Sequence, residues 1–143
     1  MGDEPGTGGA SAAATRARTG TLYHIARDED WARAQARSRY EGGALCRRDG
    51  FIHFSTRDQL AGTLARFFAG ADGLVLLMAD ARALASGLRW EAAPDGRLYP
   101  HYYGALPVGS LACLGPIGSD KAGGHVLPLT AGAEAARPGG GGR

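Results

Sequence analysis

One stretch of continuous apolar residues constrains the fold more than any other part of the chain. The segment GLVLLMAD, residues 73–80, runs without a polar residue from Leu74 to Ala79. A strand on the surface of a sheet alternates apolar and polar residues, whereas a strand covered on both faces is apolar throughout. We therefore predict a buried strand here, with other elements packed against both of its faces.

Two further segments have the pattern of amphipathic helices. Residues 29–38 begin among acidic side chains, which suit a helix start, and carry one mostly apolar stripe that includes Trp31. In residues 56–70, Thr56 and Gln59 form a capping-box pattern ahead of leucines and phenylalanines at helical spacing. We predict a helix in each segment, the second one ending at a glycine.

The other elements are shorter. Strand composition is found in TLYHIA, FIHFS and SLACLGPIG, a helical turn is predicted for ARALASG, and LRWEAAPDGRLYPHYYG has the pattern of a hairpin around a Pro-Asp-Gly turn. The glycine-rich segment EGGALCRRDG, residues 41–50, is predicted to be a loop. This order indicates a compact α+β fold, a mixed or antiparallel split sheet with two main helices.

Length and composition indicate one domain. The chain has 143 residues, and residues 1–20 and 130–143 contain few large apolar side chains. Such segments cannot offset the entropy cost of ordering, so we predict disordered tails around a single globular domain at residues 21–129. The net charge of +2 argues against a nucleic-acid partner. Because no signal peptide and no apolar run of membrane-spanning length are present, we expect a cytoplasmic protein without a membrane partner.

The two cysteines give little evidence of a metal site. Cys46 and Cys113 lie far apart and form no CxxC pair, so one disulfide is possible but zinc binding is not indicated. We expect Cys113, in a predicted strand, to be a buried free thiol. The histidines also lack HxH or HExxH spacing, so we expect no metal cofactor.

Four polar residues interrupt apolar segments and are the candidates for chemistry. His24 and His53 lie within predicted strands, Glu91 follows Trp90, and His101 lies in YPHYYG. An imidazole can bind a sugar hydroxyl or carry a proton, and a half-buried carboxylate must be paired or face a cleft. Together they would line one cleft if their strands were neighbours.

Other interpretations of these residues remain open. A histidine in a strand is commonly a satisfied structural residue, Glu91 could be the outward member of an alternating strand, and His101 could serve loop packing. Ser55 could pair with a histidine, although no GxSxG elbow surrounds it. No GxGxxG or Walker spacing follows a strand, which argues against a classical dinucleotide-binding fold.

A string of motifs resembles a known family. LYHIA, Trp31, DGFIHFST with Gln59, LVLLMAD, LRWE and YPHYYGALP occur in this order across residues 21–117. They resemble the small bacterial family called domain of unknown function 952, which is grouped by remote similarity with the ADP-ribosyltransferase superfamily. The resemblance implies an ADP-ribosyltransferase-like fold that binds NAD in a cleft between two small sheets.

The resemblance also implies roles for single residues. His24 matches the element that bonds a ribose, and His53 with Ser55 and Thr56 matches the element that holds the nicotinamide ribose or ring. Glu91 matches the carboxylate that stabilises the oxocarbenium-like ribose and orients the nucleophile. His24, His53 and Glu91 are thus the predicted catalytic residues.

Further residues complete the implied NAD site. His101 and Tyr103 are added to the cofactor-binding set, and the aromatic residues available to stack on nicotinamide are Tyr40, Phe67, Tyr102 and Tyr103. RNA 2′-phosphotransferases of the same superfamily grip phosphate with histidines and arginines, and the arginines that could do so here are Arg27, Arg47, Arg48 and Arg57.

We therefore expect an NAD-binding protein or an NAD-utilising transferase with a small-molecule nucleotide ligand. Two alternatives are a non-catalytic module that binds a nucleotide or other small ligand, and a metabolic enzyme acting on a small phosphorylated or sugar-containing substrate. The enzyme class rests on the resemblance alone, because one fold can host many functions and does not by itself determine the activity. The sequence predicts neither the acceptor nor the oligomeric state.

Overall fold

The apolar run of residues 73–80 forms the centre of the main sheet. It folds as β4, Leu74–Asp80, which pairs antiparallel with β1, Thr21–Arg27, on one side and with β8, Ala112–Ser119, on the other. The computed structural model describes residues 20–120 and 122–129, and within them this sheet has the order β1-β4-β8-β9, with β9 at His125–Val126. The prediction of a strand buried on both faces is confirmed, since Leu74 through Ala79 are all buried.

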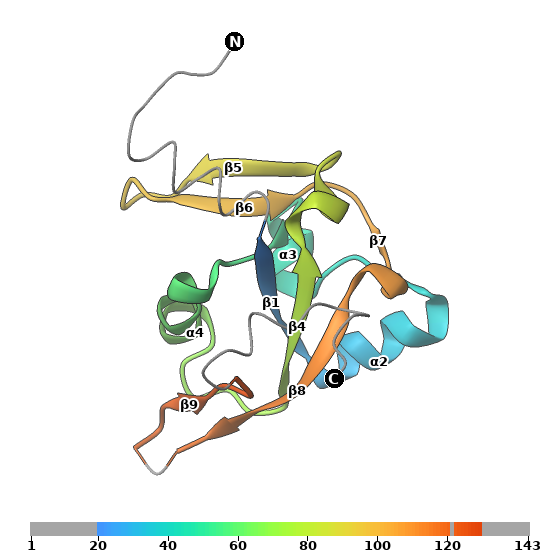
Figure 1. The fold of residues 1–143 in the computed structure, drawn as a ribbon. Helices are drawn as coiled ribbons and strands as arrows, with labels where there is room; N and C mark the ends of the chain where they lie inside the picture. The colour runs from blue at the N-terminus through green and yellow to red at the C-terminus, as the bar shows by residue number, and fades with distance from the viewer. Residues whose placement is uncertain (1–19, 121, 130–143) are drawn as a thin grey trace.

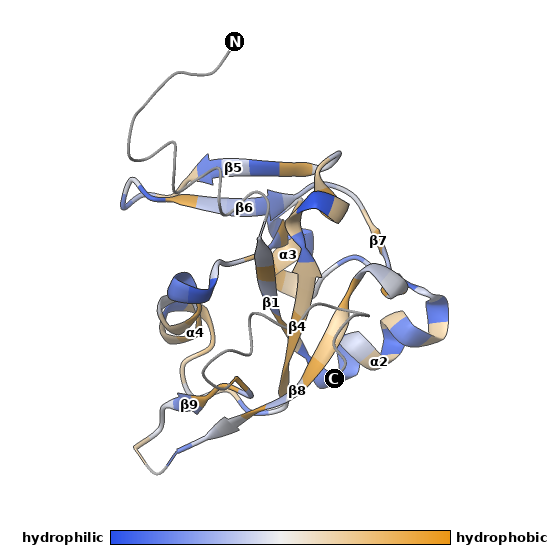
Figure 2. Cartoon of the chain, viewed as in Figure 1, coloured by the Kyte–Doolittle hydropathy of each residue, from blue (hydrophilic) through white to orange (hydrophobic). Residues whose placement is uncertain are grey.

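Alternate side chains of β1 and β4 enter two separate apolar clusters. One cluster joins residues such as Leu77 to α2, Asp28–Arg37, and the other joins residues such as Leu76 to α4, Leu60–Phe67. Figure 1 shows α2 and α4 on opposite sides of the sheet, and Figure 2 shows the hydrophobic colouring concentrated on β4 and β8. The two helices therefore supply the covers that a doubly buried strand needs.

Two smaller sheets stand beside the main one. The first has the order β3-β6-β5 and the second pairs β2 with β7; their bounds are Ile52–His53 (β3), Leu98–Tyr102 (β6), Leu88–Ala92 (β5), Arg39–Tyr40 (β2) and Leu106–Pro107 (β7). The predicted hairpin is β5–β6. Every strand pair in the described ranges is antiparallel. Of the two predicted arrangements, the structure therefore has the split antiparallel sheet and not the mixed sheet.

The segment predicted as a loop contains a helix. Ala44–Asp49 forms α3, with Gly43 before it and Gly50 after it at a φ of 88°. The glycines are its boundaries, because a left-handed residue ends a helix readily when it has no Cβ. In so short a helix the flanking glycines dominate the composition, which made the sequence resemble a loop.

Other predicted elements differ in extent. FIHFS contributes only β3 and one further bridge, between Ser55 and Tyr23. The second predicted helix begins as a 3-10 turn, η1 at Arg57–Gln59, and then becomes α4, while the expected capping box of Thr56 and Gln59 is present. Two more 3-10 turns are η2, Ala81–Leu84, where a helical turn was predicted, and η3, Val108–Ser110.

One prediction about β8 was wrong. Cys113 is exposed and not buried, because β8 is covered less completely than β4 and buries only Ile117. The chain also continues into β9, which pairs with the end of β8. Neither cysteine forms a disulfide.

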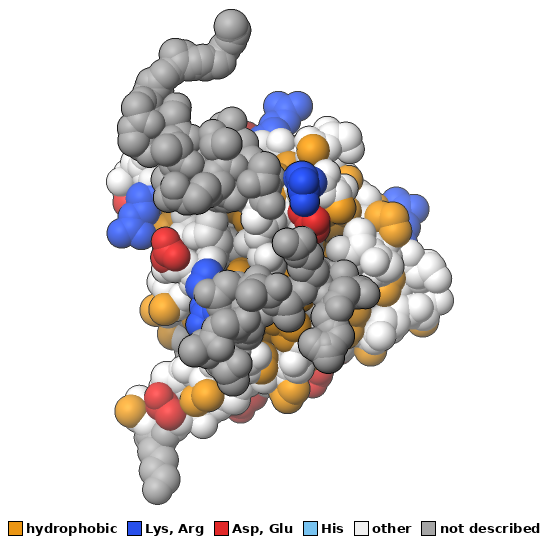
Figure 3. Space-filling view, viewed as in Figure 1, with side chains coloured by type: hydrophobic (Ala, Val, Ile, Leu, Met, Phe, Trp, Pro, Cys, Tyr) orange, Lys and Arg blue, Asp and Glu red, His pale blue; other side chains and the backbone are white. Residues whose placement is uncertain are grey.

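The surface mixes both charge signs. On the face shown in Figure 3, Arg side chains lie among Asp and Glu side chains without a patch of one sign. No helix within residues 20–120 and 122–129 is long and apolar enough to cross a membrane. The predicted tails, residues 1–20 and 130–143, lie outside the described residues except for Gly20.

Candidate functional site

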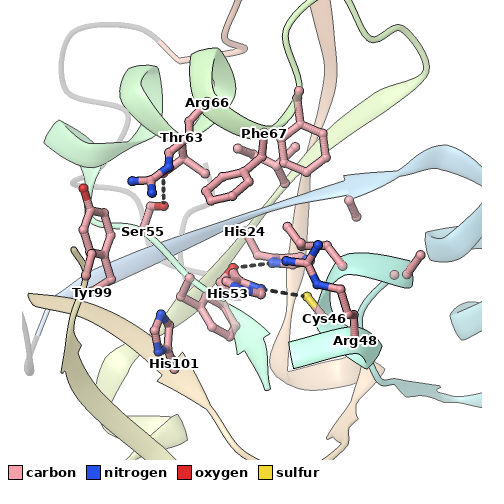
Figure 4. Close-up of a pocket in the computed structure, with 18 of the residues that line it drawn as sticks. His24, Cys46, Arg48, His53, Ser55, Thr63, Arg66, Phe67, Tyr99 and His101 are labelled. Carbon is pink, nitrogen blue, oxygen red and sulfur yellow. Dashed lines mark hydrogen bonds between the residues drawn. The ribbon is translucent and has the colours of Figure 1, made fainter. Parts of the chain in front are cut away.

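A pocket of about 530 Å³ opens where the three sheets meet, between α3, α4 and the β5–β6 hairpin. Four of the predicted site residues line it, namely His24, His53, Ser55 and His101. Figure 4 shows these side chains together with Arg48 from α3 and with Arg66 and Phe67 from α4. The three strand histidines therefore line one pocket in the structure.

His24 is held at the junction of all three sheets. From β1, its Nδ1 donates to the backbone carbonyl of His53 on β3 at 2.6 Å, and its Nε2 accepts from the Tyr40 hydroxyl on β2 at 2.6 Å. A carbonyl can only accept, which fixes the proton on Nδ1. Both ring nitrogens are therefore used within the protein, and His24 has none left to bond a ribose directly.

His53 forms a chain of contacts with two residues of α3. Its Nε2 lies 3.0 Å from Asp49 Oδ2, and its Nδ1 lies 3.3 Å from Cys46 Sγ. The paired Arg48 guanidinium keeps the pKa of Asp49 below its usual value, so this carboxylate is ionised and accepts the Nε2 proton. Nδ1 is then the acceptor and the Cys46 thiol is the donor.

His101 is oriented by a carboxylate that lies outside the pocket lining. Its Nδ1 donates to Glu91 Oε1 at 2.8 Å, and the Tyr103 hydroxyl donates to the same oxygen at 2.8 Å. These hydrogen bonds, that of His101 first, lower the pKa of Glu91 and keep it ionised. Phe51 stacks on the imidazole with ring centroids 4.0 Å apart. His101 lines the pocket, and its Nε2 has no hydrogen-bond partner in the described part of the chain.

Two other predicted residues have local structural contacts. The Ser55 hydroxyl bonds Thr63 Oγ1 at 3.0 Å, so the alternative of a Ser–His pair is not realised in the described structure. Thr56 caps η1, with its backbone N–H donating to Gln59 Oε1, and it does not line the pocket. Glu91 and Tyr103 are also outside the lining, and they reach the pocket only through His101.

Several lining residues were not assigned to the site from the sequence. They are Cys46, Arg66 and Tyr99, together with Phe51 and Asp49, which contact the lining histidines. The segment CRRDGFIH did contain a signal, since Cys46 and Asp49 are three apart and lie on one side of a helix. That signal was hidden because the segment was interpreted as a loop.

No group of three or more His, Cys, Asp or Glu side chains that could hold a metal ion occurs among the residues the structure describes. The histidines instead contact carbonyl, hydroxyl, carboxylate and thiol groups of the protein itself.

The fold and these motifs agree with a family model. The model described as "Protein of unknown function (DUF952)" matches residues 25–112, more than half of the chain. The chain belongs to the DUF952 family. The crystal structure of protein CC0527 from Caulobacter crescentus is similar, with 36% identity and a TM-score of 0.69 over 73% of this chain and 92% of that chain.

A second experimental structure of the same neighbour is similar to a comparable degree. The solution NMR structure of CC0527 has 36% identity and a TM-score of 0.65, covering 73% of this chain and 90% of that chain. Both structures come from a target of the Northeast Structural Genomics Consortium. No match is found among curated proteins.

The buried state of His24 predicts a specific pH dependence of stability. Desolvation by burial lowers the pKa of His24 from 6.5 to about 4. A histidine whose folded pKa lies below its unfolded pKa contributes fully above pH 6.5, and its contribution is lost as the pH falls toward 4. The loss is about 3 kcal/mol of unfolding free energy for the whole shift.

Urea unfolding measured across this pH range tests the point. His24→Gln should flatten the dependence of the unfolding free energy on pH, whereas the control His125→Gln, at the sheet edge, should leave it as in the wild type. If the unfolding free energy changed with pH equally in His24→Gln and in the wild type, His24 would not be held neutral by the fold.

Proposed function

We propose that the pocket binds a nucleotide of the NAD or ADP-ribose class and that the protein is a transferase acting on it. The observation that carries the proposal is the convergence of cationic, aromatic and acid–base groups in a single cavity of about 530 Å³. A cavity of this size is typical of small-ligand and cofactor sites. The split antiparallel sheets around the pocket are in keeping with an ADP-ribosyltransferase-like fold, which is part of the proposal.

The charges suit a phosphorylated ligand. Arg48 and Arg66 lie on opposite sides of the pocket in Figure 4, and Arg27 also lines it. Guanidinium groups bind phosphate oxygens by paired hydrogen bonds, and they do so best where water is partly excluded. Arg48 is already paired with Asp49 at 2.9 Å, so Arg66 is the arginine we assign to the phosphates.

Aromatic groups near the arginines suit the rings of a nucleotide. Phe67 is exposed on α4 beside Arg66, and Tyr99, on the β5–β6 hairpin, lines the opposite wall of the pocket. An exposed phenylalanine at a pocket mouth costs solvation free energy, and a stacked base would remove that cost. We assign the base or nicotinamide ring to these side chains.

The catalytic group of this proposal is His101, with Glu91 as its positioning residue. Glu91 fixes the Nδ1 proton of His101, so Nε2 can take a proton from an acceptor hydroxyl. The acceptor oxygen then bonds to the ribose carbon that bears the nicotinamide, and nicotinamide leaves as a neutral base. This revises the role expected for Glu91, which contacts His101 and does not line the pocket itself.

Arg66→Ala tests the binding step. Removing the guanidinium should raise the Kd for ADP-ribose roughly tenfold, which corresponds to about 1.4 kcal/mol. The measurement is isothermal titration calorimetry, and the matched control is Arg82→Ala on η2, which lies outside the pocket and should bind as the wild type does. If millimolar ADP-ribose or NAD neither binds nor raises the melting temperature of the wild type, the nucleotide proposal is wrong.

Glu91→Gln separates binding from chemistry. The amide cannot hold the His101 proton in the same way, so nicotinamide release from NAD should fall by a factor of roughly 100 while the Kd for ADP-ribose stays within about twofold. Glu41→Gln, an exposed residue paired with Arg39, is the control. Binding of ADP-ribose without nicotinamide release by the wild type would instead indicate a binding module or an enzyme acting on another phosphorylated substrate.

A further inference from the structure

A second group of reactive side chains lies in the same pocket and is not used by the nucleotide proposal. Cys46, on α3, is 5% exposed and belongs to the pocket lining. Its Sγ lies 3.3 Å from His53 Nδ1, and His53 Nε2 lies 3.0 Å from Asp49 Oδ2. Thiol, imidazole and carboxylate are thus connected in series, with the thiol at the pocket end, as Figure 4 shows for the first pair.

The donor and the acceptor of each hydrogen bond in this series follow from the charge of Asp49. The Asp49 carboxylate also accepts two hydrogen bonds from Arg48, at 2.9 and 3.3 Å, which keeps it anionic and fixed in place. The His53 Nε2 proton points to Asp49, so among the described residues the Cys46 thiol supplies the proton that Nδ1 accepts. A nucleophile, its base and a group that orients the base are the parts required for covalent catalysis.

A purely structural thiol would not need these partners. Cys113, the other cysteine, is exposed on β8 and has no such histidine contact in the described structure. Cys46 is also closely seated, because a Cβ at Gly42 would come within 2.8 Å of its sulfur. The backbone at Gly42 has a φ of 86°, which favours glycine, so the chain is shaped to hold the sulfur beside the imidazole.

We propose that Cys46 is a catalytic nucleophile for acyl transfer from a small ester or thioester bound in the pocket, with His53 as its base and Asp49 as a positioning residue. In the first step, the thiol proton passes to His53 Nδ1 while sulfur bonds to the carbonyl carbon, and the leaving alkoxide or thiolate takes that proton as it departs. Water then hydrolyses the resulting thioester, giving up its proton through His53, and the thiol is regenerated. No further reactant is needed.

The protonation states agree with this geometry. Burial raises the pKa of the Cys46 thiol, so the resting thiol is neutral and must give up its proton during the attack. Burial also lowers the pKa of His53, with His101 opposing its charge as well, so the imidazole is neutral and able to accept that proton. A neutral pair of this kind acts by general-base catalysis.

Acylation by p-nitrophenyl acetate tests the proposal on the full-length chain. The protein carries Cys113→Ser, so that the exposed thiol does not react. We expect a burst of p-nitrophenol and, by mass spectrometry of peptides, one acetyl group on Cys46. Cys46→Ala in the same background should lose both signals while its melting curve stays cooperative. An intact Cys46 that stays unacetylated while Lys121 or the N-terminus reacts would overturn the proposal.

Two variants that leave the thiol in place test the series of contacts. His53→Gln should slow acetylation of Cys46 by a factor of roughly 100, the scale of a lost general base. Asp49→Asn should slow it roughly tenfold and Asp49→Glu should recover part of the rate, whereas the control Asp58→Asn, exposed on η1, should not change it. Acetylation as fast in His53→Gln as in the parent would also overturn the proposal. Titration of the same proteins with ADP-ribose reports on nucleotide binding separately, since the acylation assay contains no nucleotide.

Discussion

The hydrogen bonds of His24 hold the architecture together. One imidazole on β1 bonds to the His53 carbonyl on β3 and to the Tyr40 hydroxyl on β2, so three sheets that share few other pairings meet at one side chain. The ring is 4% exposed, and each nitrogen would leave a costly buried polar group if its partner were lost. The edge contact of its ring with Tyr40 and the tilted contact with Phe54 fill the surrounding space.

The site depends on this arrangement. Because His24 fixes the His53 backbone, the His53 ring is presented to Cys46 and Asp49 of α3, and its pairing partner on β6 is His101. The two rings lie 5.5 Å apart. Each has its own carboxylate, Asp49 for one and Glu91 for the other. His24 therefore organises the structure, whereas the other two histidines line the pocket. In our proposals the reactive nitrogen is Nδ1 of His53 and Nε2 of His101.

The sequence was most informative where patterns were local. The doubly buried strand at residues 73–80, the capping box of Thr56 with Gln59, and the β5–β6 hairpin follow from side-chain periodicity and turn chemistry, and all are present. Pairings between distant segments could not be read in this way. Periodicity does not reveal that Tyr40 reaches His24, nor that the carboxylate of Glu91 turns to His101. The glycines around α3 hid a six-residue helix, and with it the relation of Cys46 to His53.

Histidine NMR on 15N-labelled protein tests the account most directly, since the tautomer of each ring follows from its partners. The prediction is a proton on Nδ1 of His24 and of His101 but on Nε2 of His53, with His24 remaining neutral as the pH falls until about 4. A His24 ring that titrates near 6.5, or a His53 ring protonated on Nδ1 at neutral pH, would contradict it.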